Sequence, residues 1–565
     1  MKHQKYLLLL IFCLSLLIRT LSVNWDGGFH LHPDERFLSM VAENISFPQN
    51  PLDYFNTATS TLNPINHRDS PFFVYGTLPL FLVKTIASLL HLDGYQSTYL
   101  VGRMISAFVD SLNIFLLFLV SKLVISQKSK LVYLASFIYS ILVLPIQLSH
   151  FFTVDTFLNT LLFATFTCLV YWVFKNQSKY FYLSALLYGL AFSVKISSIL
   201  FSPVIAIIFI YYFWQHKKIN LFYPFIFTLI ALVIFRIFLP YAFSGLITFN
   251  PKFIANLKEL SGILYNRIPS YPPAIQYQSK IPIIYPLISL IVWGLGLPFF
   301  FYLFFNLKKI FSNFVIKLSL FWIVFLIIVQ GSQFSIPLRY FLPIYPFIAL
   351  IISYLYYRSS SKYLFLFVLA LQSIYLLAFL NIYLHPHSRV QASEWIFKNI
   401  APASTIATEL WDDPLPLDVN HQSSRIYQFQ ELSLYDPDTT QKMEILSNNL
   451  KKSDYISLSS NRLWSSIPPL PQRYPLTSVY YQKLFDHQLD FEKTISFHSY
   501  PGFEISFLNK CYYFGPSNYP THLNKNTWFS IQSSCNHPGI YFRDDTAEES
   551  FTVYDHPSVI IFQKK

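Results

Sequence analysis

Charged residues are scarce in this chain of 565 residues, because Asp, Glu, Lys and Arg make up only 12% of it. Soluble globular proteins carry roughly 25%. Glycine (14 residues) and cysteine (four residues) are also rare, which excludes a glycine-rich flexible chain and a cysteine-rich secreted scaffold. In their place stand 58 Phe and 40 Tyr, and the chain is 53% hydrophobic. This composition is typical of a protein that crosses a membrane many times.

The motifs of several enzyme classes are missing as well. The sequence has no glycine-rich phosphate loop, no HExxH metal site, no Cys/His zinc pattern and no Ser-His-Asp nucleophile signature. The net charge of +12 comes largely from short Lys and Arg clusters between apolar runs, and no long basic stripe occurs. We therefore expect membrane lipids as partners and no nucleic acid.

Apolar runs recur from Leu7 to Leu384 and then stop. A spanning helix needs about 20 mostly apolar residues. The first run lacks a small-x-small cleavage site, so we interpret it as an uncleaved membrane helix. A further run, 72–90, is interrupted by Gly76, Pro79 and Lys84. The candidate spans are 6–23, 100–121, 131–149, 156–174, 180–194, 197–213, 220–240, 281–304, 314–330, 338–357 and 363–384.

The basic clusters set the expected orientation. Basic residues gather on the cytoplasmic side of membrane proteins. If the N-terminus is cytoplasmic and 72–90 does not span, every cluster between the spans falls on that side. We therefore predict eleven spans, an interfacial or re-entrant helix at 72–90, and an extracytoplasmic C-terminal tail. The clusters are Lys2 and Lys5; Lys122, Lys128 and Lys130; Lys175 and Lys179; Lys217 and Lys218; Lys308 and Lys309; Arg358 and Lys362.

The composition shift after Leu384 predicts two domains, a membrane domain over 1–384 and an extracytoplasmic domain over 385–565. In the tail, helical patterns over 393–399 and 440–451 alternate with strand patterns over 405–408 and 455–458, and the end reads as a strand and a turn within 551–557 followed by a strand over 559–562, which predicts a small α/β domain. Cys511 and Cys535 lie in this domain, where a disulfide is allowed but spacing alone does not decide it. The cluster Trp411-Asp412-Asp413 is either an ordinary loop or part of an acceptor site.

The first expected outer loop, 24–99, carries the densest polar cluster, His32-Pro33-Asp34-Glu35-Arg36. Two adjacent carboxylates at the membrane surface suit general-base catalysis, in which one takes a proton and the other orients groups or raises its partner's pKa. Asp34 and Glu35 are thus the candidate catalytic residues, with His32 and Arg36 as substrate-binding candidates. The structural alternative is a helix N-terminus with acidic residues in its first turn.

Several cations are candidates for binding a phosphate. Arg68, beside His67, stands at the far end of the first loop, and Arg103 lies near the outer end of a span. Lys195 and Arg339 lie at the outer ends of other spans. Each has a structural alternative, namely an ion pair with a neighbouring helix or snorkelling to the interface.

Three other polar or aromatic residues complete the candidate substrate-binding set. His150 and Asp155 lie in one expected outer turn, and Tyr340 follows Arg339. Asp155 precedes an apolar run, so a helix cap is the alternative.

The chain resembles the polyprenyl-phosphate-dependent glycosyltransferases of the GT-C type, the group that contains protein O-mannosyltransferases and aminoarabinose transferases (glycosyltransferase families 39 and 83). The resemblance covers about residues 1–385 and depends on the order of its motifs. They are His32-Pro33-Asp34-Glu35 after the first span, the interfacial run 72–90, Arg103, Asp155, the stretch Gly189–Lys195 and the stretch Arg339–Pro343. Where the family often has a Lys-Pro-Pro-like segment, this chain has Arg68-Asp69-Ser70-Pro71.

The resemblance implies an inverting transfer of a sugar from a polyprenyl-phosphate carrier to an acceptor hydroxyl of a glycan, lipid or protein. It implies that Asp34 or Glu35 acts as base and that the cations hold the carrier phosphate. No metal is implied, although His32, Asp34 and Glu35 together offer ligands for a divalent cation. A transporter or lipid flippase is the main alternative, and a membrane scaffold that presents the tail is another.

Overall fold

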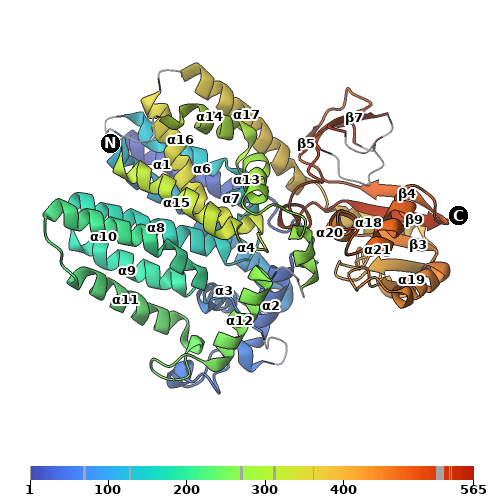
Figure 1. Cartoon of the computed structure of the whole chain (residues 1–565), viewed down its shortest axis with the longest axis horizontal. Helices are drawn as coiled ribbons and strands as arrows, with labels where there is room; N and C mark the ends of the chain where they lie inside the picture. The colour runs from blue at the N-terminus through green and yellow to red at the C-terminus, as the bar shows by residue number, and fades with distance from the viewer. Residues whose placement is uncertain are drawn as a thin grey trace.

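The chain forms a helical part, on the left of Figure 1, and a mixed part of helices and strands on the right. The computed structural model describes residues 2–67, 72–125, 129–266, 271–308, 313–359, 362–516, 527–533, 535 and 537–565. The change from one part to the other comes near residue 385, where α17 (Lys362–Leu380) and a short 3-10 turn, η10 (Asn381–Leu384), end.

Within the part of the chain that the structure describes, six helical stretches are long and apolar enough to cross a membrane. Two bent helix pairs raise this number to eight if each pair is one span. Each expected span falls on such a stretch, on a bent pair, or on a shorter helix. The six are Tyr95–Val124 (α4 Tyr95–Ser111 with α5 Asn113–Val124), Asp155–Lys175 (α8), Ile196–His216 (η4 with α10 Ser202–His216), Phe314–Gly331 (α15), Leu338–Arg358 (η9 with α16 Tyr345–Arg358) and Lys362–Asn399.

The bent pairs and shorter helices fill the gaps between these stretches. Lys130–Ser140 and Val143–Ser149 meet at 58°, and Ile284–Leu295 and Leu297–Asn306 meet at 113°. The shorter apolar helices are α1 (Lys2–Arg19), α3 (Thr77–Leu89), α9 (Ser178–Phe192) and α11 (Phe222–Phe238). Helix α8 is mostly buried, because 78% of its most apolar stretch is covered by the rest of the protein. It packs against α9, α5 and α4.

The sharper bend depends on Gly296, whose φ of +91° suits a residue without a Cβ. A Cβ there would lie 2.6 Å from the side-chain oxygen of Gln372. Gln372 is fully buried and donates from Nε2 to the carbonyl of Leu295 at 3.0 Å. The bend breaks the helical hydrogen-bond ladder, and this side chain satisfies a carbonyl that water cannot reach in a membrane.

One end of the helical part carries helices that do not belong to long spans. Helix α2 (Pro33–Asn44) packs against α3 and α4. Helix α12 (Pro251–Tyr265) lies against the segment before α3, because Asn256 donates to the carbonyl of Phe73 at 3.5 Å. Helix α3 confirms that 72–90 is helical. Its 13 residues extend about 20 Å at 1.5 Å per residue, which is short of a hydrocarbon core of about 30 Å.

The tail is built on a five-stranded sheet in the order β2-β1-β3-β9-β4. Strand β1 pairs in parallel with β2 and β3, whereas β9 is antiparallel to both β3 and β4. The strands are β1 (Thr405–Glu409), β2 (Gln428–Leu432), β3 (Tyr455–Leu458), β4 (Phe491–Phe497) and β9 (Val559–Lys564).

Both faces of this sheet are covered, which explains its apolar strands. Val559 and Ile561 of β9 pack on α18 (Ser388–Asn399), while Ile560 and Phe562 face the other helices. Successive residues of a strand point to opposite faces, so four consecutive apolar residues serve two cores. The helices of the second face are α19 (Thr440–Lys452), α20 (Arg462–Ser466) and α21 (Pro475–Phe485). The α/β character expected of the tail is confirmed.

A smaller sheet of four short strands, in the order β5-β8-β6-β7, completes the tail. Cys511 on β6 forms a disulfide with Cys535, the pairing that the sequence left open. The strand expected at the start of 551–557 is wrong, whereas the turn expected after it is present. The first residues of this stretch belong to a short helix, α22 (Glu549–Thr552), whose N-terminus is capped by the side chain of Glu548. The four strands are β5 (Gly502–Glu504), β6 (Cys511–Phe514), β7 (Phe529–Gln532) and β8 (Gly539–Phe542).

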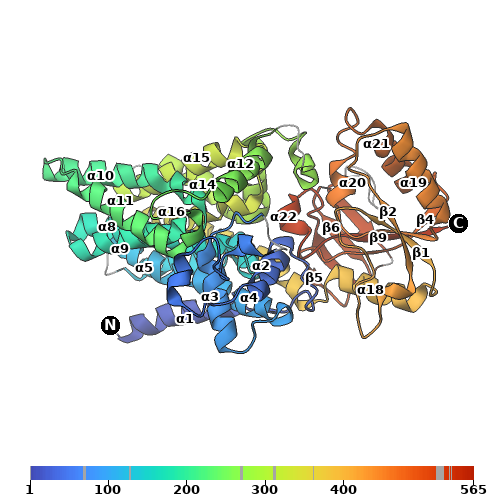
Figure 2. The same cartoon turned by 90° about the horizontal axis from the view of Figure 1, so that it is seen from below.

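Helix α22 and the turn after it lie where the two parts of the molecule meet (Figure 2). Gln147, from the bent pair, donates to both carboxylate oxygens of Asp555 at 3.0 and 3.2 Å, and Tyr383 donates to one of them at 2.6 Å. Phe551 packs between Phe379 and His556. The junction is therefore a packed interface with buried polar contacts, not a loose tether.

Candidate active site

A fully buried ion cluster anchors the start of the first loop. The guanidinium of Arg103, on α4, is bound by two carboxylates: Asp26 at 2.9 and 3.0 Å and Glu35 at 2.5 and 2.9 Å. All three side chains are inaccessible to solvent. Arg103 also donates to the carbonyl of Val23 at 2.8 Å. The carboxylate of Glu35 also accepts a hydrogen bond from the backbone N–H of Phe152 at 2.8 Å.

This cluster changes the roles expected for two candidates. Glu35 faces Arg103 and has no exposed atom, so its carboxylate is not accessible to a substrate at the surface of the loop. The donors of Arg103 are occupied by carboxylates and a carbonyl, which leaves it no free edge for a carrier phosphate. The structure corrects both expectations: Glu35 and Arg103 hold the loop in place, and Asp26 completes their cluster.

Asp34 points the other way, because neighbouring helical residues differ in direction by about 100°. Its carboxylate forms an ion pair with Arg339, which opens the Leu338–Arg358 stretch, and accepts a hydrogen bond from Tyr75. The Asp34 side chain is 23% exposed and that of Arg339 is 16% exposed. Burial by itself raises the pKa of Asp34, but the charge of Arg339 outweighs it and holds the pKa below its usual value.

A close approach of two backbones places Tyr75. The N–H of Gly76 donates to the carbonyl of Val194 at 2.9 Å. A Cβ on Gly76 would lie 2.0 Å from the carbonyl oxygen of Ser193, so only glycine fits. This contact sets the start of α3 against the segment that carries Lys195.

Lys195, Asp155 and Tyr340 form the next part of the site. The ammonium of Lys195 lies 3.1 Å from the carboxylate of Asp155 and 4.3 Å from the ring centre of Tyr340. Asp155 begins α8, where a negative charge is favourable. Arg339 also lies against Tyr340, with its guanidinium carbon 5.9 Å from the ring centre. Two cations and two carboxylates thus converge from four separate segments.

A cavity of about 270 Å³ opens from this group into the apolar region. One end is lined by Tyr75, Asp155, Lys195, Arg339 and Tyr340. The remainder is lined mostly by apolar side chains of α8, η4, α12 and α15. They include Leu158, Leu162, Ile199, Leu200, Leu257, Leu260, Trp322 and Leu326. The cavity therefore offers an amphipathic ligand a charged end and an apolar wall.

His32 lies beside Asp34 as the N-cap of α2, and its Nδ1 accepts the N–H of Glu35 at 3.4 Å. Its ring packs between Phe151 (4.6 Å) and Tyr554 of the tail (4.3 Å). Burial lowers the pKa of His32 to about 4, so the imidazole is neutral at pH 7. Within the described part of the chain, its Nε2 and the Nε of Arg339 are buried without a hydrogen-bond partner. Two unsatisfied donors or acceptors beside the Asp34–Arg339 pair are a feature of a site that takes a ligand.

Arg36 connects the loop to the tail. It donates to Asp413 at 2.7 Å and to the carbonyl of His30 at 2.9 Å. Arg389 holds the other oxygen of Asp413 and an oxygen of Asp412, both at 2.6 Å. These contacts give Arg36 and the Asp412-Asp413 pair a part in docking the tail, a different role from the substrate binding or plain loop expected of them.

Of the remaining candidates, His67 and His150 lie apart from the cavity, and Arg68 is not among the described residues. His67 bonds to the carbonyl of Thr61 at 2.9 Å in the first loop. His150 has both ring nitrogens on backbone carbonyls, those of Ile146 and Leu21, and stacks on Tyr383, which leaves no nitrogen for a substrate.

No group of three or more His, Cys, Asp and Glu side chains among residues that the structure places is arranged to hold a metal ion. The expected set of His32, Asp34 and Glu35 does not surround one point, because both oxygens of Glu35 are bound by Arg103. These three residues therefore do not form a binding site for a divalent ion.

Sequence reasoning missed several residues at the site. Tyr75 carries no motif, and the tail residues Glu548 and Tyr554 lie more than 200 positions from the groups they touch. Asp26 belongs to the polar start of the first loop. Its place between a membrane helix and the acidic motif is a signal that could have identified it.

Residues 79–241 match the family described as dolichyl-phosphate-mannose-protein mannosyltransferase. The matched segment runs from α3 to the end of α11 and contains Arg103, Asp155 and Lys195. The match favours a transferase over the transporter and scaffold alternatives.

Solved structures of two GT-C type proteins are similar to the chain. ArnT from Cupriavidus metallidurans bound to undecaprenyl phosphate is 11% identical with a TM-score of 0.44, over 82% of this chain and 94% of that chain. The oligosaccharyltransferase AglB from Archaeoglobus fulgidus, in complex with an inhibitory peptide and a dolichol-phosphate, is 12% identical with a TM-score of 0.48, over 84% of this chain and 72% of that chain. No curated protein sequence matches the chain.

Proposed function

We propose that the protein transfers a sugar from a polyprenyl-phosphate carrier to an acceptor hydroxyl, with inversion at the anomeric carbon, on the outer face of the membrane. The observation that carries the proposal is the cavity whose apolar wall ends at Lys195 and Arg339, with Asp34 ion-paired to Arg339 behind that end. The apolar wall suits the polyprenyl chain, the two cations suit its phosphate, and the carboxylate suits a proton acceptor.

The phosphate is held by Lys195 and Arg339 in this proposal. Arg339 keeps its Nε unpaired while another of its nitrogens binds Asp34, so it can receive a phosphate oxygen without first releasing the carboxylate. Charge-assisted bonds of this kind are about twice as strong as neutral ones. Neutralising the phosphate also makes it a better leaving group.

Asp34 acts as the general base. The acceptor hydroxyl oxygen forms a bond to the anomeric carbon, while the bond from that carbon to the phosphate oxygen breaks and its electron pair stays on the phosphate. The hydroxyl proton passes to the carboxylate of Asp34. A phosphate bound to Arg339 shares the cation that lowers the pKa of Asp34, so donor binding raises the basicity of the carboxylate when it is needed.

The test is sugar release and transfer from radiolabelled polyprenyl-phosphate sugars by purified protein, with several donor sugars and a membrane extract as acceptor source. We expect Asp34→Asn to lose at least 100-fold in rate, in line with the effect of removing a general base. Glu43→Gln is the matched control, because Glu43 is an exposed carboxylate on the same helix. Equal rates for Asp34→Asn and wild type would remove Asp34 from the reaction.

A further inference from the structure

A second cavity, of about 490 Å³, lies in the tail and shares no lining residue with the first. It is enclosed by η10, the start of α18, strand β4 and the small sheet. Ligand cavities in proteins commonly measure about 300–1,000 Å³ and combine apolar walls with a few polar groups. This cavity is therefore large enough for a ligand of one or two sugar rings.

Lys493, on β4, is the unusual residue of this wall. It is partly buried, and in the part of the chain that the structure describes its ammonium has no ion pair or hydrogen bond. Burial lowers the pKa of Lys493 to about 7, and no carboxylate offsets the shift. A buried ammonium without an anion is unfavourable, because it loses water and gains nothing in exchange. An anionic ligand would supply the missing partner.

Among the described residues that line the cavity, the single carboxylate, that of Glu504, is already engaged. Oε1 of Glu504 lies 3.4 Å from Nε2 of His385 and 3.4 Å from Nδ1 of His537. His498 also lines the cavity, stacked on Tyr500. No described carboxylate of the wall pairs with Lys493, so the anion that this ammonium lacks would have to come from a ligand.

The rest of the wall suits a sugar. Tyr513 and Tyr541 stack on one another at 5.6 Å, and with Tyr500 they offer aromatic surface to the apolar faces of a ring. Gln391 and Gln532 add amide groups that can bond to hydroxyls.

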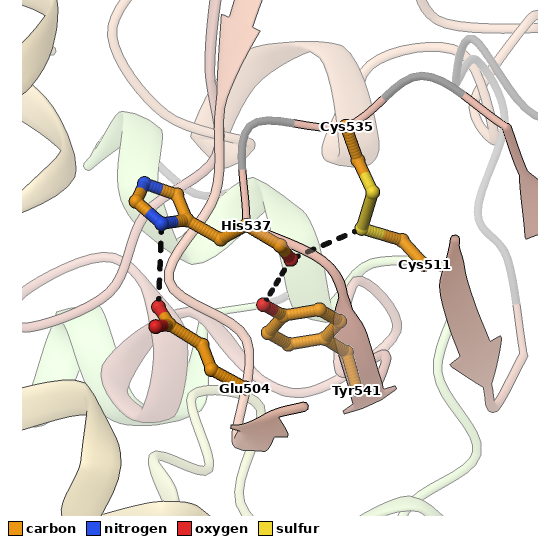
Figure 3. Close-up of a disulfide and its surroundings, with 5 residues drawn as sticks. All are labelled: Glu504, Cys511, Cys535, His537 and Tyr541. Carbon is orange, nitrogen blue, oxygen red and sulfur yellow. Dashed lines mark hydrogen bonds and ion pairs between the residues drawn. A yellow bond between two sulfur atoms is a disulfide. The ribbon is translucent and has the colours of Figure 1, made fainter. Parts of the chain in front are cut away.

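The walls are also fixed in place. The disulfide of Cys511 and Cys535 links β6 to the connection between β7 and β8, and the hydroxyl of Tyr541 donates to the carbonyl of His537 at 2.6 Å (Figure 3). Strand β6 pairs in parallel with β8, so Tyr513 is held opposite Tyr541. A preformed cavity loses little conformational entropy when it binds.

We propose that this cavity is a second ligand site that binds an anion-bearing saccharide, with Lys493 against the anionic group and the tyrosine rings against the sugar. The saccharide is either a soluble glycan or the headgroup of a glycolipid, because η10 brings the cavity to the end of a membrane helix. The site is distinct from the transfer site and does not depend on the reaction proposed there.

The experiment measures binding by calorimetry to the full chain in phosphatidylcholine nanodiscs. The probes are hyaluronan disaccharide, which carries a carboxylate, and diacetylchitobiose, a neutral disaccharide of similar size. We expect the charged disaccharide to bind at least tenfold more tightly. Lys493→Met removes this preference, Lys493→Arg keeps it, and Lys483→Met, at an exposed lysine on α21, leaves it unchanged. Thermal unfolding of each variant verifies that it is folded.

Three results would overturn the proposal. One is equal affinity for the two disaccharides, and another is full binding by Lys493→Met. The third is competition: if inorganic phosphate, or phosphatidylglycerol in the nanodisc, displaces the charged disaccharide as well as unlabelled disaccharide does, the cavity is a plain anion or phospholipid site. Sugar release from the lipid donor is measured on the same samples and is expected to be unchanged by Lys493→Met. Loss of the transfer activity and loss of this binding are therefore separate outcomes.

Discussion

Glu548 of the tail accepts a hydrogen bond from the backbone N–H of Leu338 at 3.0 Å, directly before Arg339 in the chain. The same carboxylate accepts the hydroxyl of Tyr277 at 2.6 Å and the N–H of Ser550 at 3.0 Å. The tail thus sets the backbone from which Arg339 projects.

Glu548→Gln tests this positioning role. Glutamine keeps one acceptor oxygen for Tyr277 and Ser550, but its amide nitrogen cannot accept the N–H of Leu338, so we expect a loss of roughly 1–3 kcal/mol in stability. We also expect a higher KM for the lipid donor with a smaller change in kcat, because Arg339 shifts while Asp34 stays. Steady-state kinetics in detergent measure both. Glu444→Gln, on exposed α19, is the control, and an effect on kcat alone would contradict the idea.

Arg339→Gln should move the acid limb of the pH–rate profile to higher pH. Burial raises the pKa of Asp34 and Arg339 lowers it, so without the arginine the burial effect is unopposed. A general base works only when deprotonated. As the pH is lowered, the variant therefore loses activity at a higher pH than wild type does. The profile of kcat/KM from pH 4 to 8 measures the shift. An unmoved acid limb in a variant with residual activity would mean that Asp34 is not the titrating group.

Arg103→Met is expected to destabilise the protein by about 3–5 kcal/mol, because it leaves the carboxylates of Asp26 and Glu35 buried without a cation. Thermal unfolding in detergent checks the change. The double variant with Glu35→Gln should recover part of the loss, since it removes one uncompensated charge. A variant that keeps full stability but loses activity would show that Arg103 binds the substrate and does not mainly stabilise the fold.

His556 should make stability depend on pH. Burial lowers its pKa, but the carboxylates of Asp555 and Asp544 prevail and raise it to about 10. The folded pKa lies above the ordinary value of about 6.5, so the stabilisation is complete below about pH 6.5 and is lost as pH rises toward 10. Unfolding temperatures of wild type should therefore fall over that range, and His556→Gln should flatten this dependence. Parallel curves for the two proteins would count against the ion pair.

The sequence predicted the parts of the site that follow from local patterns. Asp34, Asp155, Lys195 and Arg339 stand near the ends of apolar runs, and the fold brings all four together although Asp34 and Arg339 are 305 positions apart. The apolar runs and the helical and strand periods in the tail were also sufficient to predict a mostly helical region followed by one that contains strands. Five of the six elements predicted in the tail agree in position with α18, β1, α19, β3 and β9, whereas β2, β4 to β8, α20 and α21 were not predicted.

The rest depends on tertiary packing. Asp34 and Glu35 are chemically equivalent neighbours, and only the position of Arg103 decides that Glu35 turns inward. The stretch Phe551-Thr552-Val553-Tyr554 alternates apolar and polar residues as a strand does. It forms a helical turn instead, because Glu548 caps it and Phe551 is buried against Phe379. Such choices come from partners far along the chain, which a local pattern does not contain.

The contacts of Glu548 and Tyr554 with the membrane part also have a consequence for biosynthesis. These residues follow every membrane segment in the chain, and the 385–547 region must be made before them. The backbone beside Arg339 and the ring of His32 lack their tail partners until that point. A nascent chain already inserted in the membrane thus has an unfinished site, so the order of synthesis delays catalysis until the tail has folded.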